Sequence, residues 1–385
     1  MAKLATSRKT ALRWSLFLVI IAIAILILWA PVSVRLRSMS VLTRFNNPEA
    51  HGFSAMFARH RFSEETGSAP IAQGQVKYRL YLPADVKRPP AILLLDGIQH
   101  LGIEDPRLIN FARALAGAGV EVMTPELQDL ADYHVTPQTI DVIGQSAAMF
   151  SSRVGGGKVG VIGTSFGGGL ALLAAARPEY APKMGFVLAV GAHDDMTRVA
   201  HFFVSNMVET PDHTQVRLQA HEYGVLVLAY AHLEDFFSSK DQPAARIALR
   251  EWLWEQPDAL KVADELTPKG KKELDLLLHD RGLLQEAFMK EIDLHKPEMD
   301  AVSPHGKLGN LTVPVFLLHG TGDSVIPASE TLWLAKDIPP QQLKALLISP
   351  ALIHVNFGER VPLSQKWALV DFLAQVLDAT DRLRH

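Results

Sequence analysis

The sequence predicts an α/β fold with a mostly parallel central sheet and helices on both faces. Short apolar runs rich in β-branched residues, typical of buried strands, alternate with helical patterns, and such alternation indicates parallel strands joined by right-handed crossovers. A chain of 385 residues that is 48% hydrophobic can also bury the large core that this architecture requires. Because such sheets bind ligands at the carboxyl ends of their strands, we expect the functional residues there.

Composition excludes several classes of function. The formal charge is −3, and no basic patch interleaved with aromatic residues occurs, so the sequence predicts no nucleic-acid partner. The chain contains no cysteine, which excludes disulfides, thiol nucleophiles and cysteine-ligated metals. The lack of cysteine does not fix the cellular compartment.

Residues 1–34 are predicted to be a transmembrane anchor. Leu16–Ala30 is apolar and uncharged, and with the apolar residues on either side it reaches the length that a bilayer requires. Four basic residues precede this run and three follow it, which favours a cytoplasmic N-terminus with the main body of the chain outside. A cleaved signal peptide is the alternative, but the run exceeds a usual h-region and Pro31 occupies the place of small cleavage-site residues.

The α/β core is predicted over residues 74–196 and 311–385. Residues 35–73 are weakly periodic and are predicted to be a tether between the anchor and this core. The first strand, Gln75–Pro83, alternates between apolar and polar residues, as a half-exposed edge strand does. Ala91–Leu95 is fully apolar, which is typical of a buried parallel strand.

Two helices follow with clear start signals. Asp105 and Pro106 form a cap and first-turn pair that begins a helix ending at Gly117. After the strand Val120–Thr124, a Thr-Pro pair opens a second helix over residues 136–153.

The second half of the core is interrupted by a long helical stretch. Gly185–Gly191 and Val313–Leu318 are predicted strands, and only helical patterns lie between them, over residues 197–310. A helical cap of this size over the carboxyl edge of the sheet can exclude water and shape an apolar pocket. A last strand, Lys344–Ser349, precedes an amphipathic helix over Ser364–Leu383.

The most informative motif is GxSxG, formed by Gly163 to Gly167 with Ser165 at its centre. A β-branched strand pattern, Val159–Ile162, leads into it, and an Ala/Leu-rich helical pattern follows directly. In this strand–turn–helix setting the serine adopts a strained conformation that projects its hydroxyl above the sheet, and the glycines allow close backbone approach. The helix that begins after the serine also directs free N–H groups toward an anion formed there.

A serine hydroxyl needs a base within hydrogen-bond reach, and the base needs an orienting carboxylate. Asp323 follows the strand Val313–Leu318 in the segment HGTGDSVIP. His354 follows the strand Lys344–Ser349 in the segment SPALIHVNF. Both side chains are therefore expected at the same sheet edge as the serine.

The order serine, aspartate, histidine resembles that of the α/β hydrolase superfamily, and the resemblance extends from about Gln75 to the C-terminus. It implies an α/β hydrolase fold with a helical cap insertion. It also implies that Ser165 is the nucleophile, His354 the general base and acid, and Asp323 the orienting carboxylate.

The resemblance further implies an oxyanion hole that combines the backbone N–H of Phe166 with that of Ile98. Many relatives carry His-Gly in the loop before Ile98, whereas this chain carries Asp96-Gly97. We expect Asp96 to tie the loop rather than to face the substrate, and His100 to be a loop or pocket residue.

Asp194 and Asp195, in the loop after the strand Gly185–Gly191, are alternative acids for the triad. Otherwise His193, Asp194 and Asp195 are expected to form a polar loop. The spacing of histidines and carboxylates predicts neither a metal site nor a cofactor.

These features predict a membrane-anchored serine hydrolase that cleaves a carboxylic ester through an acyl-enzyme. The expected substrate is a small-molecule or lipid-like ester. An amidase, a peptidase and an acyltransferase would use the same catalytic residues. A non-catalytic, hydrolase-like binding or scaffold module is the alternative from another class.

Overall fold

The computed structural model describes residues 29, 31–353, 356–357 and 362–383. Almost all of the predicted anchor, and the predicted base His354, lie outside these residues. Among the helices that the structure describes, none combines the length and apolar composition needed to span a membrane.

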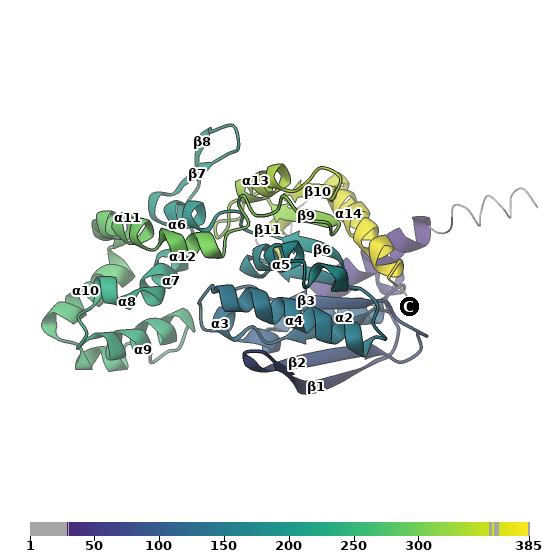
Figure 1. The fold of residues 1–385 in the computed structure, drawn as a ribbon, viewed down its shortest axis with the longest axis horizontal. Helices are drawn as coiled ribbons and strands as arrows, with labels where there is room; N and C mark the ends of the chain where they lie inside the picture. The colour runs from purple at the N-terminus through teal and green to yellow at the C-terminus, as the bar shows by residue number, and fades with distance from the viewer. Residues whose placement is uncertain (1–28, 30, 354–355, 358–361, 384–385) are drawn as a thin grey trace, which may run out of the picture.

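An eight-stranded sheet forms the centre of the protein, in the order β1-β2-β4-β3-β5-β6-β9-β10 (Figure 1). The six strands from β4 to β10 in this order run parallel, and β2 is antiparallel to both of its neighbours. The mostly parallel sheet predicted from the sequence is therefore confirmed. The strands are β1 (Phe62–Ile71), β2 (Gly74–Pro83), β3 (Ala91–Leu95), β4 (Glu121–Pro125), β5 (Val159–Thr164), β6 (Met184–Val190), β9 (Val315–Gly320) and β10 (Leu343–Ser349).

Helices cover both faces of this sheet, as the alternation of elements predicts. Leu93 and Leu95 of β3 belong to the apolar cluster that includes α4 and α5, whereas Ile92 and Leu94 belong to the cluster that includes α2 and α14. The core helices are α2 (Pro106–Gly117), α3 (Gln128–Ala131), α4 (Pro137–Arg153), α5 (Phe166–Ala176), α13 (Ser329–Asp337) and α14 (Leu363–Asp381). The predicted caps are present, since the side chains of Asp105 and Thr136 accept backbone N–H groups at the starts of α2 and α4.

The predicted tether over residues 35–73 is wrong, because this segment belongs to the folded core. β1 pairs with β2 along its whole length, from Phe62 opposite Pro83 to Ile71 opposite Gly74. On this side of the sheet the edge strand is therefore β1. β2, which was predicted to be an edge strand, is an interior strand. The sequence of β1, FSEETGSAPI, lacks apolar alternation because most of its side chains are exposed, so its main-chain pairing leaves no hydrophobic pattern to detect.

The helix over residues 31–46 also packs on the core. The Arg37 guanidinium pairs with both carboxylate oxygens of Asp381 at 2.9 and 3.0 Å, and the Ser38 hydroxyl donates to the carbonyl oxygen of Val370 at 2.8 Å. Both contacts join this helix to α14.

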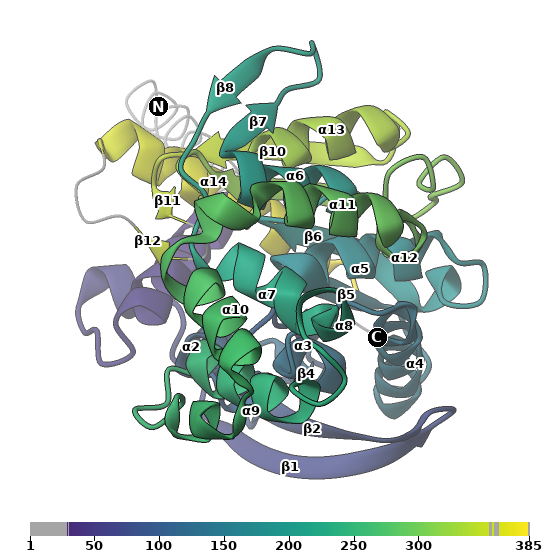
Figure 2. The same ribbon diagram turned by 90° about the vertical axis from the view of Figure 1, so that its left-hand side faces the viewer.

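The segment between β6 and β9 is mostly helical and is called the insertion below. It contains α6 (Met196–Ser205), β7 (Met207–Glu209), β8 (Gln215–Arg217), α7 (Tyr223–Ala231), α8 (Leu233–Phe236), α9 (Gln242–Leu253), α10 (Pro268–His279), α11 (Gln285–Leu294) and α12 (Lys296–Ala301). The β7–β8 hairpin was not predicted, since each of its strands has only three residues and every residue of β8 is exposed. α7 to α11 lie at one end of the molecule and the helix over residues 31–46 at the other (Figures 1 and 2).

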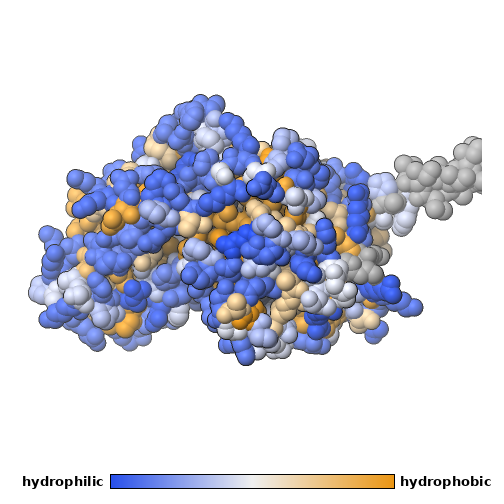
Figure 3. Space-filling model, viewed as in Figure 1, coloured by the Kyte–Doolittle hydropathy of each residue, from blue (hydrophilic) through white to orange (hydrophobic). Residues whose placement is uncertain are grey.

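Short elements complete the chain: the 3₁₀ turns Phe53–Ala55, Gly102–Glu104, Ala181–Lys183, Lys261–Glu265 and Arg281–Leu284, and the strand pair β11 (Leu352–Ile353) and β12 (Asn356–Phe357). On the face seen in Figure 3 the surface is largely hydrophilic and is interrupted by separate hydrophobic patches.

Candidate active site

Ser165 lies at the sharp turn between β5 and α5. Its backbone has φ 52° and ψ −132°, a combination that non-glycine residues rarely adopt. Its N–H donates to the carbonyl oxygen of Val190 in β6 at 2.7 Å, which fixes the turn against the neighbouring strand. The residue is only 4% exposed. This is the strained strand–turn–helix conformation that the GxSxG motif predicts.

The turn can close only because glycines surround the serine. A Cβ atom on Gly163 would lie 2.6 Å from the carbonyl oxygen of Gly167. A Cβ atom on Gly97, in the loop after β3, would lie 2.7 Å from the Cβ of Ser165. The loop after β3 therefore runs directly beside the candidate nucleophile, as an oxyanion loop must.

Asp96 ties this loop, as expected from the sequence. Its carboxylate accepts the N–H of Gly97 at 2.8 Å and the side-chain amide of Gln99. Burial, and then the nearby Asp105, raise the pKa of Asp96 to about 7. Because the Gly97 N–H is engaged within the loop, Ile98 and Phe166 stay the predicted oxyanion donors.

Asp323 lies at the same edge of the sheet, three residues beyond the end of β9. The side chain is fully buried, and its Oδ1 accepts the N–H groups of Val325 and Ile326 at 2.9 and 3.0 Å. A Cβ atom on Gly191, directly after β6, would lie 3.4 Å from Asp323 Oδ2. Ser165 and Asp323 therefore lie on either side of the end of β6, whereas His354 lies outside the described residues.

A second histidine, His319, lies near Asp323, but its two ring nitrogens already contact Ile326 and Thr331. Its Nε2 is 3.4 Å from Asp323 Oδ2 and 2.8 Å from the carbonyl oxygen of Ile326, and its Nδ1 is 2.6 Å from the Thr331 hydroxyl. His319 therefore braces the aspartate loop and is not a candidate base.

The alternative acids Asp194 and Asp195 belong to a different network. The Arg198 guanidinium donates to Asp194 Oδ2 at 2.9 Å and to Glu330 Oε1 at 2.6 Å. Glu330 also accepts the backbone N–H groups of Asp194 and Asp195, both at 2.9 Å. Burial and the neighbouring Glu330 raise the pKa of Asp194, against the effect of Arg198. The network joins the loop after β6 to α13.

His193, Asp194 and Asp195 lie in the loop after β6, and His193 and Asp194 are completely buried there. The ring of His193 lies against Phe166, with centroids 5.2 Å apart, and its Nε2 is 3.0 Å from the carbonyl oxygen of Val302. Burial lowers the pKa of His193 and so favours the neutral imidazole. The supporting role of His193 behind the serine turn was missed, since nothing in the local pattern distinguishes it from a loop histidine.

The insertion contacts the core at three of the loops that border the candidate site. The N–H of His221 donates to the carbonyl oxygen of Ser324 at 2.7 Å, directly after Asp323. The Tyr133 hydroxyl donates to the carbonyl oxygen of Leu253 at 2.9 Å. In the loop after β3, the ring of His100 stacks on Trp254 with centroids 5.6 Å apart. The insertion therefore contacts loops at the carboxyl edge of the sheet, and its role as a cap stays a prediction.

Tyr223 is the first residue of α7 and follows His221, whose N–H contacts Ser324, by two positions. Burial, followed by the charge of Asp323, raises the pKa of the Tyr223 hydroxyl above its ordinary value. The cation of Arg107, which also forms a 2.9 Å ion pair with Asp105, opposes this rise. No local pattern in the sequence distinguishes Tyr223 from the other aromatic residues of the insertion.

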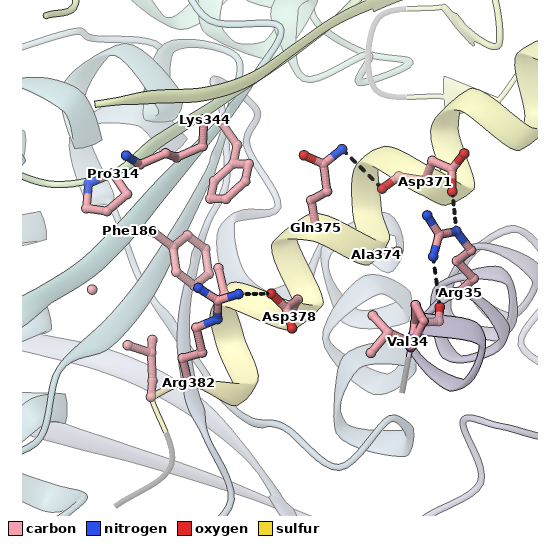
Figure 4. Close-up of a pocket in the computed structure, with 15 residues that line it drawn as sticks. Val34, Arg35, Phe186, Pro314, Lys344, Asp371, Ala374, Gln375, Asp378 and Arg382 are labelled. Carbon is pink, nitrogen blue, oxygen red and sulfur yellow. Dashed lines mark hydrogen bonds and ion pairs between the residues drawn. The ribbon is translucent and has the colours of Figure 1, made fainter. Parts of the chain in front are cut away.

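A groove of about 640 Å³ lies at the opposite edge of the sheet, between the helix over residues 31–46 and α14 (Figure 4). Its two arginines are already paired, Arg35 with Asp371 at 2.5 Å and Arg382 with Asp378 at 2.6 Å. The groove contains Gly185 and Pro314, which lie at the amino ends of β6 and β9, so it is separate from the site around Ser165.

Two groups of side chains in the described part of the chain could hold a metal ion. One contains Asp194, His305 and Asp337, where Arg198 already supplies a cation. The other contains His232, Glu234 and His295 in the insertion. Neither group includes Ser165 or Asp323.

No known protein-family model and no curated protein matches the sequence. Solved structures that resemble the fold include a hyperthermophilic esterase from the archaeon Pyrobaculum calidifontis, with 17% identity, a TM-score of 0.48 and coverage of 84% of this chain and 86% of that chain. The esterase domain of a Rhodothermus marinus protein has 15% identity and a TM-score of 0.42 over 83% of this chain and 98% of that chain. A 2-hydroxy-6-oxo-6-phenylhexa-2,4-dienoate hydrolase from a Rhodococcus species has 17% identity and a TM-score of 0.43 over 84% of this chain and 100% of that chain.

The α/β hydrolase fold is assigned here from the geometry of the chain itself. The features typical of this fold are the strand order, the antiparallel β2 and the strained serine between β5 and α5.

Proposed function

We infer that this chain is a member of the α/β hydrolase superfamily, and we propose that it is a serine hydrolase that cleaves a carboxylic ester. The single observation that carries the proposal is the backbone of Ser165, which holds φ 52° and ψ −132° between β5 and α5. Strain of this kind is retained where it positions a reactive group. It makes the hydroxyl at the end of β5 the candidate nucleophile.

In the proposed reaction the Ser165 hydroxyl oxygen attacks the ester carbonyl carbon while His354 accepts the hydroxyl proton. The tetrahedral intermediate then collapses, and its C–O bond to the alcohol breaks as His354 returns the proton to the leaving oxygen. In the second half of the reaction, His354 takes a proton from water as the water oxygen attacks the acyl carbon. The bond between the acyl carbon and the Ser165 oxygen then breaks, His354 returns the proton to the serine oxygen, and the acid is released. No net oxidation or reduction occurs.

Asp323 is the proposed partner of His354. Its Oδ1 accepts two backbone N–H groups, which fix the orientation of the carboxylate. A carboxylate held in this way can fix the tautomer of an imidazole and stabilise the imidazolium that forms during proton transfer. The backbone N–H groups of Phe166 and Ile98 are the proposed donors to the oxyanion.

The proposed substrate is a small-molecule or lipid-like ester with an apolar acyl group. Ser165 is almost completely covered, and aliphatic and aromatic side chains dominate the insertion that contacts this edge. An apolar acyl chain fits such surroundings better than a charged one.

Membrane attachment is a separate proposal that rests on the sequence of residues 1–34 alone. We propose that this segment is a single-pass anchor with a cytoplasmic N-terminus and that the catalytic domain lies outside. Alkaline carbonate extraction of membranes tests the attachment, because an integral protein stays in the pellet. Release of the full-length chain into the supernatant would contradict it.

A fluorophosphonate probe tests the serine assignment. We expect the full-length protein to be labelled in detergent and Ser165→Ala to lose all labelling. Ser151→Ala, which removes a buried hydroxyl from α4, is the matched control and should be labelled normally. Labelling that survives Ser165→Ala would overturn the proposal.

Turnover of p-nitrophenyl esters of increasing chain length, with a p-nitroanilide in parallel, distinguishes the remaining alternatives. An esterase hydrolyses the esters faster, whereas an amidase or peptidase cleaves the anilide, and an acyltransferase responds to added alcohol. No turnover of any acyl chain, together with tight binding of a partner, would favour the non-catalytic module. The protein should retain residues 31–73, because a fragment beginning at residue 75 would lack all of β1.

A further inference from the structure

Two histidines of the insertion lie together although 62 positions separate them in the sequence. His232 connects α7 to α8, and His295 connects α11 to α12, so each is the junction residue between two helices. Their rings stack with centroids 3.5 Å apart and an interplanar angle of 18°. Both side chains are 13% exposed, so solvent reaches the pair.

Carboxylates surround this pair. His295 Nε2 is 2.7 Å from Asp235 Oδ2, and its Nδ1 is 3.5 Å from Glu298 Oε1. Glu234 brings a carboxylate oxygen within 4.8 Å of a ring nitrogen of each histidine. Lys296 does not balance these charges, because its ammonium group is paired with Asp300 at 2.6 Å.

Glu291 is the strongest sign that this cluster can bind a cation. The residue is 2% exposed, and neither of its carboxylate oxygens has a hydrogen-bond partner. His232 Nε2 lies 3.7 Å from Glu291 Oε1. A buried carboxylate without hydrogen bonds is costly, and a bound cation removes that cost.

We propose that His232, His295 and Glu234 bind a divalent transition-metal ion of the Zn²⁺ type, with Glu291 as an additional carboxylate beside it. Two imidazoles with carboxylates form a common zinc ligand set, and a chain without cysteine has no softer alternative. Asp235 supplies the outer contact typical of such sites. If Nε2 donates its proton to Asp235 Oδ2, Nδ1 is the ligand nitrogen, and the ion replaces the 3.5 Å contact of Nδ1 with Glu298 Oε1.

Binding requires a small rearrangement of the two rings. They now stack face to face, whereas a metal ion accepts an in-plane lone pair from each imidazole, so each ring turns its edge toward the ion. The ion would then join the α7–α8 junction to the α11–α12 junction. Since α7 begins at Tyr223, two residues after the His221 contact with Ser324, the metal would stiffen the part of the insertion that borders the candidate active site.

The other candidate group provides an internal comparison. Asp194 and Asp337 share the single imidazole of His305, at 3.1 and 3.0 Å, and Arg198 already neutralises Asp194. Among the residues that the structure describes, only the His232 group combines two imidazoles with a buried carboxylate whose oxygens lack hydrogen bonds. We therefore assign the metal to that group alone.

The test is zinc binding by the full-length protein in detergent, after treatment with a chelator. Equilibrium dialysis against ZnCl₂ measures stoichiometry, competition with a chromophoric chelator measures affinity, and thermal unfolding measures the shift in Tm. We expect one zinc ion per chain and a rise in Tm with zinc concentration. His232→Ala and His295→Ala should each weaken binding by tenfold or more.

Two control variants compare the proposed ligands with other histidines of the chain. His279→Ala removes an exposed histidine of the insertion, paired with Asp275 at 3.0 Å, and should bind zinc normally, as should His305→Ala. If the histidine variants do not fold, Glu234→Ala at an exposed position provides the second test and should also weaken binding. Failure of the wild-type protein to retain zinc, equal affinity in the ligand variants, or loss of zinc in His305→Ala would each overturn the proposal.

Discussion

Two buried aspartates at the carboxyl edge of the sheet, Asp194 after β6 and Asp323 after β9, have opposite surroundings. Asp194 belongs to an ion-pair network in which Arg198 contacts both Asp194 and Glu330. Asp323 is held through Oδ1 by two backbone N–H groups. Both are completely buried, so burial alone does not distinguish them.

The difference shows how partners determine the role of a buried acid. A carboxylate that an arginine already neutralises can offer little to an imidazole, whereas one oriented by backbone N–H groups keeps its charge for that purpose. We therefore assign Asp194 to stability and Asp323 to the proposed triad. The predictions below test this division.

The largest expected effect is on catalysis. Asp323→Asn should lower kcat/KM by about 10⁴-fold, because the amide keeps the acceptor for the two backbone N–H groups but no longer stabilises an imidazolium. Its Tm should stay close to that of the wild type. Asp194→Asn should retain most of the activity. Measurement of ester hydrolysis by both variants decides the assignment, and the reverse pattern would exchange the two roles.

The next effect is on stability. Arg198→Met should destabilise the fold by about 3–5 kcal/mol, because it leaves Asp194 and Glu330 buried without their cation. Urea unfolding measures the change. The control Arg382→Met removes an ion pair with Asp378 whose side chains are 77% and 52% exposed, so it should cost about 1 kcal/mol or less. Equal losses in both variants would show that the Arg198 network has no special role.

A third carboxyl group, that of Asp96, is expected to make the free energy of unfolding depend on pH. Its pKa is raised to about 7 in the folded protein, against an ordinary value of 3.8. Between these values the folded state binds a proton that the unfolded state does not, so stability should fall as pH rises through this window and level off above it. The contribution is at most about 1.4 kcal/mol per pH unit. Urea unfolding from pH 5 to 8 should show this slope reduced in Asp96→Asn, and an unchanged slope would contradict the assignment.

The smallest effect concerns the hydroxyl beside Asp323. Tyr223→Phe should change kcat/KM by no more than about tenfold, because it removes a neutral group near the carboxylate and leaves the triad intact. The matched control is Tyr230→Phe, which removes a hydroxyl that donates to Asp132 at 3.0 Å elsewhere in the insertion. A loss in Tyr223→Phe as large as that of Asp323→Asn would place Tyr223 in the catalytic machinery.

The sequence predicted the elements whose apolar pattern or caps are strong. β3, α2, α4 and the serine turn occur within one or two residues of their predicted bounds. β1 was missed because exposed side chains give no periodic signal, and the β7–β8 hairpin because its strands are too short to show one. Hydrogen bonds between main chains hold these elements together, and such bonds leave little signal in the local sequence.

For the candidate site, the sequence predicted where Ser165 and Asp323 lie in the fold better than it predicted the contacts of the neighbouring side chains. The motif and the strand ends predicted the sheet edge on which Ser165 and Asp323 lie. Contacts between distant segments were not predicted, because no local pattern contains them. They include the packing of His193 on Phe166 and the interactions of Asp194 with Arg198 and Glu330. The position of His354 relative to Ser165 stays a prediction.

The placement of the helix over residues 31–46 at the end of the molecule remote from α7 to α11 has a consequence for substrate delivery (Figure 1). If residues 1–34 hold the protein in a bilayer, α7 to α11 of the insertion lie at the end of the molecule that is remote from the lipid. A lipid-derived ester would then have to dissociate from the membrane, or arrive on a carrier, before hydrolysis. A water-soluble ester should accordingly be hydrolysed at the same rate by the enzyme in proteoliposomes and in detergent micelles.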